Sequence, residues 1–146
     1  FARTILDEKN GPPPEVNLFN EKNNGESILN LIDKGYVKSA HDISLGGLLV
    51  AISKMCIRGN KGIKINKSKN LINEIEYFFA EDQGRYLIEV NKEDLKEVTK
   101  ILNKNSVHHE ELGIITQNDM IINEKTKVTI DELKSYYTSW LLKYMS

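Results

Sequence analysis

Apolar residues recur every three or four positions in several stretches of the chain, which is the spacing expected for the buried face of a helix. The turn-forming residues between these stretches separate one predicted helix from the next. The predicted helices cover residues 17–34, 48–57 and 71–79, a stretch that follows Asn91, and a stretch from Thr129 to about Lys143.

Polar residues and glycine mark the ends of three predicted helices. Asn17 is a suitable N-cap for the first helix, and Gly35 stands where a C′ glycine is expected. Asn91 is a possible cap for the fourth helix. Thr129, followed three residues later by Glu132, has the pattern of a capping box at the start of the last helix.

The helical spacing also predicts which side chains are buried. In the last helix we expect the aromatic residues to dock on the core rather than to form a cofactor site. The predicted buried positions are Leu18, Ile28, Leu31 and Ile32 in the first helix, Leu95, Val98, Ile101 and Leu102 in the fourth, and Leu133, Tyr136, Tyr137, Trp140 and Leu141 in the last.

Alternating apolar and polar residues predict strands between the helices. Asn118-Asp119 suits a tight turn, so the last two predicted strands would form a hairpin. Strands that alternate with helices predict an α/β (α+β) two-layer sandwich, with a mixed sheet flanked by helices. The predicted strands cover residues 36–40, 62–66, 85–90, 107–115 and 120–122.

The first sixteen residues differ from the rest of the chain. Asn10-Gly11 and the three prolines that follow predict a turn and a stiff extended stretch. We expect residues 1–16 to be a linker or strap from a preceding domain, and residues 17–146 to form one α/β domain. The chain starts with Phe1 rather than methionine, which we interpret as a start inside a longer polypeptide.

Composition narrows the function classes. The chain has 146 residues with 40% hydrophobic and 28% charged residues and a net charge of −1, and the basic residues form no stripe. We therefore expect neither nucleic-acid binding nor, without a long apolar run or a signal sequence, a membrane location. The single cysteine, Cys56, excludes an internal disulfide, fits a reducing cytoplasm and is expected to be a buried apolar residue.

The segment Ser39-Ala40-His41-Asp42-Ile43-Ser44-Leu45-Gly46-Gly47-Leu48 carries the first candidate site. A polar turn with paired glycines joins a predicted strand to a helix, and free N–H groups at a helix start attract anions such as phosphate. Asp42 is of the residue type that ligates Mg²⁺. The segment lacks the Gly-Lys-Ser/Thr of a Walker loop. The alternative is a capped helix start whose glycines permit close packing.

The segment Phe79-Ala80-Glu81-Asp82-Gln83-Gly84-Arg85 carries the second candidate site, on a loop before a predicted strand. Its carboxylates and arginine could hold a phosphate and a metal. The alternative is a solvated turn in which Asp82 and Arg85 pair locally.

His108-His109-Glu110-Glu111 has the composition of a metal site. On the predicted strand, however, adjacent side chains point to opposite faces, so the two histidines would not converge. The sequence shows no Ser/His or Cys/His spacing that indicates a nucleophile and its base. We therefore expect no catalytic residue and no metal ligand in this chain.

Four segments together resemble one enzyme family. The His41 and Glu81 segments are similar to the His-Asp-Val/Ile-Ser-Asp-Gly-Gly-Leu and Phe-Gly-Glu-Asp/Ser-Gln-Gly/Ala-Arg motifs of phosphoribosylformylglycinamidine synthase. The Gly11-Pro12-Pro13-Pro14 lead-in and the Trp140–Met145 ending resemble the same family, in the same order. The resemblance covers essentially the whole chain and corresponds to the last of four domains.

The resemblance implies a function for the full enzyme. The family uses ATP, Mg²⁺ and ammonia from glutamine to convert formylglycinamide ribonucleotide to formylglycinamidine ribonucleotide, in the cytoplasm, in purine biosynthesis. Its main ATP site, catalytic histidine and most metal ligands lie in upstream domains. The implied partners are those domains, a glutaminase and a small accessory subunit. The isolated chain is expected to be inactive, and no cofactor is certain for it.

The resemblance also suggests phosphate- or nucleotide-binding residues. One departure weakens the suggestion, because Leu45 stands where the family has aspartate and can neither ligate a metal nor accept a hydrogen bond. The family positions that this chain keeps are His41, Asp42, Ser44, Gly46, Gly47, Glu81, Gln83 and Arg85.

Two alternatives stay open. The chain could be a stand-alone module that dimerises or binds another protein through an apolar face. It could also be the equivalent domain of a related enzyme, such as aminoimidazole ribonucleotide synthetase, selenophosphate synthetase or a hydrogenase maturation factor. The proline lead-in and the Trp140–Met145 ending favour the synthase.

Overall fold

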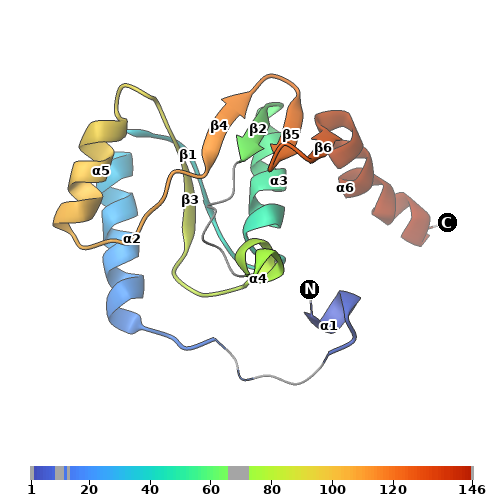
Figure 1. The fold of residues 1–146 in the computed structure, drawn as a ribbon, viewed down its shortest axis with the longest axis horizontal. Helices are drawn as coiled ribbons and strands as arrows, with labels where there is room; N and C mark the ends of the chain where they lie inside the picture. The colour runs from blue at the N-terminus through green and yellow to red at the C-terminus, as the bar shows by residue number, and fades with distance from the viewer. Residues whose placement is uncertain (1, 9–11, 13, 66–72, 146) are drawn as a thin grey trace. The chain divides into compact units, whose positions relative to one another are not determined.

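The computed structural model describes residues 2–8, 12, 14–65 and 73–145, and Figure 1 labels its elements. The described chain divides into two compact units, one made of Phe1–Ala51 and Ile75–Glu110, the other of Ile52–Glu74 and Glu111–Ser146. The elements are α1 (Ala2–Ile5), α2 (Leu18–Asp33), β1 (Val37–Asp42), α3 (Gly47–Gly59), β2 (Gly62–Ile65), α4 (Glu74–Phe79), β3 (Tyr86–Val90), α5 (Leu95–Lys104), β4 (Gly113–Thr116), β5 (Asp119–Ile122), β6 (Thr126–Thr129) and α6 (Ile130–Met145).

The first unit is built on an antiparallel pair of strands, β1 and β3, in which Asp42 lies opposite Tyr86. Helices α2 and α5 contribute the core residues Leu31, Val98 and Leu102, which pack against apolar side chains of the two strands. Figure 1 shows α2 and α5 beside the strand pair. The predicted buried face of the fourth helix is confirmed at Val98 and Leu102.

Helix α2 confirms its predicted ends but not its whole predicted stripe. The Asn17 side chain accepts a hydrogen bond from the Asn20 N–H at 3.0 Å, and Gly35 has a φ of +74°. Leu31 is buried, whereas Leu18 and Ile32 are exposed, so their predicted burial was wrong. The inward side of the helix is defined instead by Leu31 and Ser27, four residues apart.

Ser27 is buried although it is polar, and a hydrogen bond explains why. Its hydroxyl accepts from the Asn105 side-chain amide at 3.0 Å, from just beyond the end of α5. A buried hydroxyl with a partner avoids the cost of lost hydration. A search for apolar spacing could not find this contact.

Two predicted boundaries in this unit were wrong. Strand β1 runs to Asp42, so His41 and Asp42 lie in the strand rather than in the turn. Helix α5 begins at Leu95, and Asn91 bonds the Asp94 carboxylate at 3.1 Å instead of capping the first turn. The Asp94 N–H donates to the Asn91 carbonyl, which forms a separate turn before the helix.

The second unit contains a four-stranded mixed sheet in the order β4-β2-β5-β6. The short central strand β2 is antiparallel to β4 and parallel to β5. Its Ile63 and Ile65 are buried, as are Cys56 of α3 and Met120 of β5. Helices with this mixed sheet confirm the predicted α+β class, and the expected burial of Cys56 is confirmed.

The predicted strand pairing in this unit was wrong in three respects. Strand β4 is Gly113–Thr116, so residues 107–112 are not strand. Strands β4 and β5 do not form a hairpin, because β2 lies between them. The hairpin joins β5 to β6, which the pattern missed, through Asn123 and Glu124 with φ of 52° and 59°. Left-handed conformations at both positions are typical of the tight turns that suit twisted hairpins.

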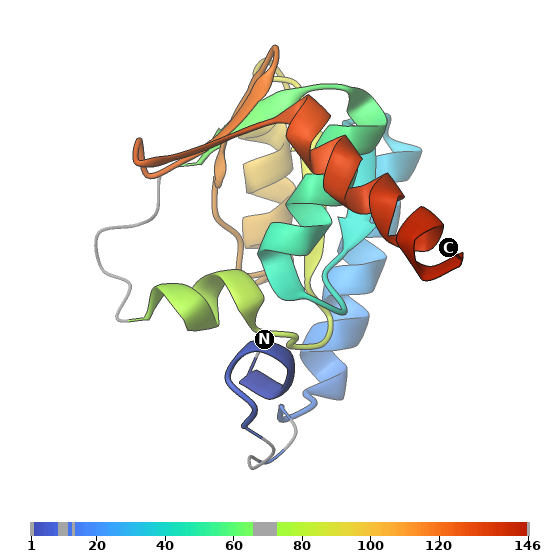
Figure 2. The same cartoon turned by 90° about the vertical axis from the view of Figure 1, so that its right-hand side faces the viewer.

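Helix α6 follows directly on β6 and is red in Figure 2. Its predicted capping box is confirmed, because Glu132 accepts from the Thr129 N–H at 2.8 Å while the Thr129 hydroxyl accepts from the Glu132 N–H at 3.2 Å. The expectation that its aromatic residues dock on the core was wrong, since Tyr136, Tyr137 and Trp140 are exposed. In the described ranges, no helix is long and apolar enough to cross a bilayer.

Some predictions fall outside the described residues. These are the turn at Asn10-Gly11, Pro13 of the lead-in, Asn66 at the end of a predicted strand, Leu71 at the start of a predicted helix, and the side chain of Leu141. Residues 1–16 as a linker and 17–146 as one domain stay a prediction.

Candidate functional site

The turn between β1 and α3 forms the first half of the candidate site. Gly46 and Gly47 have φ of +87° and +69°, a conformation that side chains other than glycine rarely adopt. A Cβ at Gly46 would lie 2.5 Å from Val50 Cγ2, and one at Gly47 would lie 2.7 Å from the Phe79 backbone. Both conformation and close packing therefore require glycine here.

The loop between α4 and β3 forms the second half. Gly84 has a φ of +68°, and its carbonyl accepts a hydrogen bond from the Asn24 side chain of α2 at 3.0 Å. The Arg85 carbonyl accepts from the Ile43 N–H at 2.9 Å, which continues the strand pairing into the turn. The loop is thus attached both to α2 and to the end of β1.

One hydrogen bond joins the two halves directly. The Glu81 carboxylate accepts from the Gly46 N–H at 2.8 Å. Both groups are near the surface, and an open hollow lies beside them, lined by Ile43, Ser44, Leu45, Glu81, Asp82 and Gln83. The structure therefore brings together Ser44, Gly46, Glu81 and Gln83 of the predicted residues.

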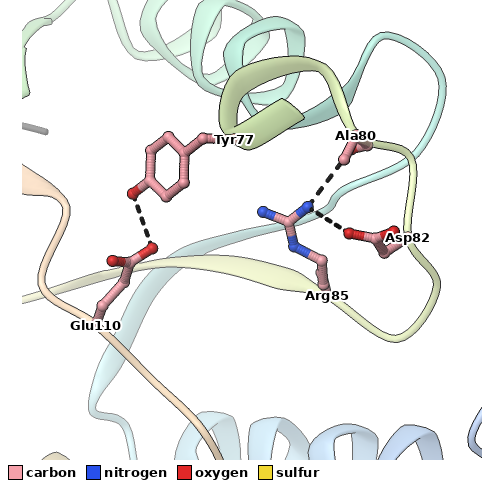
Figure 3. A network of polar contacts seen from close by, with 5 residues as sticks. All are labelled: Tyr77, Ala80, Asp82, Arg85 and Glu110. Atoms are coloured by element: carbon pink, nitrogen blue, oxygen red, sulfur yellow. Dashed lines mark hydrogen bonds and ion pairs between the residues drawn. The ribbon is translucent and has the colours of Figure 1, made fainter. Parts of the chain in front are cut away.

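The other four predicted residues do not line this hollow. His41 is half-buried in β1, with its Nδ1 against the Asp42 carbonyl and 3.5 Å from the Asp42 carboxylate. Asp42 is exposed, and Gly47 is buried as the first residue of α3. Arg85 is not among the lining residues, and its guanidinium lies against Ala80 and Asp82 (Figure 3).

The Arg85 guanidinium binds within its own loop. It donates to the Ala80 carbonyl at 3.4 Å and forms an ion pair with Asp82 at 3.3 Å (Figure 3). The local Asp82–Arg85 pair expected as the alternative is therefore present. Such a partly exposed pair contributes little to stability.

The carboxylates of the two motifs each lie against a neighbour within the fold. Glu81 is bonded to Gly46, Asp82 to Arg85, and Asp42 lies next to His41. Throughout the described part of the chain, no three His, Cys, Asp or Glu side chains are grouped so that they could hold a metal. His108 and His109 do not lie in a strand, so the alternating side-chain geometry expected for them was wrong.

A second polar contact supports the loop from α4. The Tyr77 hydroxyl donates to the Glu110 carboxylate at 2.8 Å (Figure 3). Burial raises the pKa of Tyr77, and the hydrogen bond to Glu110 and its negative charge raise it further. The phenol therefore stays neutral and acts as a donor, which ties α4 to the segment after α5.

Sequence reasoning missed the residues that support the site from other elements. Asn24 holds Gly84 from α2, and Val50 closes the space beside Gly46 from α3. Asn24 lies among other polar residues in the first half of α2, so no local signal marks it. Val50 follows the glycine pair by one helical turn, and that spacing could have suggested a contact.

Residues 1–123 match the profile of the family described as "AIR synthase related protein, C-terminal domain". Among curated proteins, the chain is 62% identical over 145 residues to the phosphoribosylformylglycinamidine synthase subunit PurL of Pelagibacter ubique (strain HTCC1062). It is 37% identical over 145 residues to the same subunit of Bartonella henselae. Each alignment covers 99% of this chain and 20% of the relative.

Solved structures agree in fold. Phosphoribosylformylglycinamidine synthase II from Thermotoga maritima matches with a TM-score of 0.71 and 19% identity, over 82% of this chain and 22% of that one. The structure of PurLQS from the same organism matches with a TM-score of 0.69 and 20% identity, over 90% of this chain and 24% of that one. The family profile and the curated relatives, with this agreement in fold, confirm the resemblance to the C-terminal domain of the synthase.

Proposed function

The chain belongs to the family of AIR synthase related C-terminal domains, and we propose that it serves as the C-terminal domain of a phosphoribosylformylglycinamidine synthase. The observation that carries the proposal is the 62% identity to the Pelagibacter subunit across almost the whole chain. The chain spans about one fifth of the length of the curated relatives.

The reaction we infer for the whole protein is the ATP-dependent conversion of formylglycinamide ribonucleotide to formylglycinamidine ribonucleotide, with ammonia derived from glutamine. We infer that the partners are the other synthase domains, a glutaminase and a small accessory subunit, and that the enzyme works in the cytoplasm with Mg²⁺. Fold similarity to a Thermotoga maritima PurL complexed with ATP supports the use of ATP, and fold similarity to a structure named PurLQS supports the inference of partner subunits.

For this domain we propose an architectural role first. The hydrogen bonds from the Gly46 N–H to Glu81 and from the Asn24 side chain to the Gly84 carbonyl connect three elements through the two motifs. The first of these bonds uses the Gly46 N–H, a group that an anion would otherwise contact. In the described residues, His41 and His109 contact backbone carbonyls rather than a Ser or Cys side chain, so we expect no turnover by this chain alone.

Phosphate binding at the hollow stays a second proposal, favoured by the paired glycines with positive φ. Backbone N–H groups in such a turn attract anions, and here the Glu81 carboxylate already accepts from one of them. A phosphate oxygen would therefore have to replace that carboxylate. The residues proposed to contact the phosphate are Ser44, Gly46 and Gln83. The other predicted residues would only help to hold the turn and the loop in position; these are His41, Asp42, Gly47 and Arg85.

The direct test is complementation. A strain that lacks its own synthase receives one of three genes: the full-length gene, the full-length gene without the codons for residues 17–146 of this chain, or the gene for this chain alone. Growth without purines is then scored. The proposal expects growth only with the full-length gene. Formation of formylglycinamidine ribonucleotide by purified chain alone would refute the architectural role, and growth with the shortened gene would refute any need for the domain.

A further inference from the structure

Helix α6 carries a row of aromatic side chains that the described structure leaves uncovered. Tyr136, Tyr137, Trp140 and Tyr144 are 78%, 55%, 61% and 83% exposed. Successive residues of a helix are about 100° apart, so these four positions fall within an arc of roughly 100° on one side. We call them the aromatic stripe of α6.

The stripe belongs to a well-anchored helix. The capping box of Thr129 and Glu132 satisfies the first turn, and Ile130, the first residue of the helix, is buried. The rings of Trp140 and Tyr144 lie 6.4 Å apart at a tilt of 53°, which is a favourable aromatic contact. The stripe therefore has a defined orientation on the helix.

The composition of the stripe is that of a protein interface. Tyrosine and tryptophan are enriched at the energetic centres of interfaces, because each ring buries a large area and loses little conformational freedom. The four positions contain no charged residue, which argues against an anionic partner such as nucleic acid. A contiguous exposed apolar patch of this kind marks an interaction site.

Helix α6 is shared with the PurL relatives but lies outside the family profile. The family profile matches residues 1–123, so α6 lies beyond the part of the chain that the wider family shares. The PurL relatives of Pelagibacter and Bartonella align over 145 of 146 residues, which includes α6. The helix is therefore a feature shared with the PurL relatives. About four fifths of each relative lies outside the aligned part.

We propose that the aromatic stripe of α6 is the docking surface for another part of the same synthase polypeptide, through an apolar patch on that part. This rests on the proposed function. A connected segment has an effective concentration of the millimolar order, so a modest apolar contact forms within one molecule before it forms between two. The contact orients the domain against the rest of the chain.

The first experiment is hydroxyl-radical footprinting of the unmodified full-length synthase, with oxidation at Trp140 and Tyr144 measured by mass spectrometry. Each rate is divided by the rate in the urea-unfolded protein. Docking predicts at least a tenfold lower rate in the native protein at both residues. Native rates close to the unfolded ones overturn the proposal.

Dilution separates the two possible occupants. The measurement is repeated over a hundredfold range of concentration, with mass measured by light scattering. Protection that persists in the monomer supports docking within one polypeptide. Protection that disappears together with a dimer assigns the stripe to a second copy and overturns the proposal.

A matched pair of variants gives an independent check in the full-length protein. Tyr137→Cys places a thiol in the stripe, and Ser135→Cys places one on the opposite, exposed side of α6. The native Cys56 is buried, and burial raises the pKa of its thiol to about 11, so it reacts slowly with maleimide. Docking predicts at least tenfold slower labelling at residue 137 than at residue 135, and equal labelling overturns it.

Activity distinguishes this proposal from the one it rests on. A full-length enzyme that forms formylglycinamidine ribonucleotide but shows an unprotected stripe leaves the proposed function standing and removes the docking surface. A full-length protein that does not form the product removes the proposed function, whatever the footprint shows.

Discussion

Glu81 and Gly46 are 35 positions apart in sequence, yet the carboxylate of the first accepts the N–H of the second at 2.8 Å. The two motifs that carry the family resemblance are thus hydrogen-bonded to each other. The bond gives Glu81 a role that does not depend on any ligand, because it fixes the loop before β3 to the turn before α3.

Removing the Glu81 carboxylate should therefore loosen the loop and free the turn. We expect Glu81→Ala to lower the free energy of unfolding by about 1 kcal/mol, the usual worth of one hydrogen bond, and Glu81→Gln to lower it less because an acceptor remains. Urea unfolding measures both. Gln83→Ala on the same loop is the control and should change stability by under about 0.5 kcal/mol.

The same variant tests phosphate binding. If the Gly46 N–H can donate a hydrogen bond to an anion, Glu81→Ala should bind pyrophosphate more tightly than the unmodified chain in titration calorimetry. Equal or absent binding in both proteins would leave Glu81 with the architectural role alone.

Glycine at position 47 should be indispensable. Gly47→Ala combines a φ of +69° with a Cβ 2.7 Å from the Phe79 backbone, so we expect a loss of about 2–4 kcal/mol. Gly59→Ala is the control in the same helix, because it meets no atom within 4 Å and has no positive φ. Gly59→Ala should leave the free energy of unfolding unchanged or raise it by up to about 1 kcal/mol, since alanine favours the helix. Similar losses at both positions would contradict the packing argument.

Leu31 should dominate the stability of α2. It is fully buried between the strands and α5, so Leu31→Ala should cost about 3 kcal/mol through lost burial and a residual cavity. Leu29, two residues earlier, is exposed, and Leu29→Ala should change the free energy of unfolding by under about 0.5 kcal/mol. A thermal or urea titration of the pair measures the difference.

The capping box of α6 should make stability depend on acid pH. The Thr129 backbone N–H, and then its hydroxyl, lower the pKa of Glu132 below its ordinary value of 4.5. A carboxyl with a lowered folded-state pKa contributes stability above its unfolded value and loses it as pH falls through the folded value. The difference in stability between the chain and Glu132→Gln should therefore be present at pH 7 and vanish progressively below pH 4.5.

Variants of Thr129 provide the control for that pH dependence. Thr129→Ser keeps a hydroxyl and should retain it, whereas Thr129→Ala removes the N-cap hydroxyl and should lower helix stability by about 1 kcal/mol. Persistence of the full pH effect in Thr129→Ala would show that the hydroxyl contributes nothing to it and that the backbone N–H alone lowers the pKa of Glu132.

Local signals predicted the features that depend on local chemistry. The predicted helix ends depend on contacts within four residues, and each has the role that its residue type and spacing indicated. These ends are Asn17 and Gly35 of α2 and Thr129 with Glu132 of α6. The buried Val98 and Leu102 followed from helical spacing because α5 has a single apolar side. The family motifs were likewise contiguous, so the resemblance could be found without the fold.

Features set by distant partners could not be predicted in this way. Strand β6 was missed because Thr126–Thr129 contains a single apolar residue, and its pairing with β5 makes it a strand. The insertion of β2 between β4 and β5 depends on tertiary packing. Ser27 is buried with Asn105 as its hydrogen-bond partner, and Glu81 joins the two motifs. Both contacts link residues far apart in the sequence, so no local pattern indicates them.

The central place of β2 has a consequence for synthesis on the ribosome. This strand leaves the ribosome with both edges unpaired and with Ile63 and Ile65 uncovered, and its partners β4 and β5 start only at Gly113 and Asp119. Until then the nascent chain exposes a short apolar strand with two open edges, which is a hazard for aggregation. Translation pauses between residues 65 and 113 should therefore lower the yield of folded protein, whereas pauses after Ile122 should have little effect on this sheet.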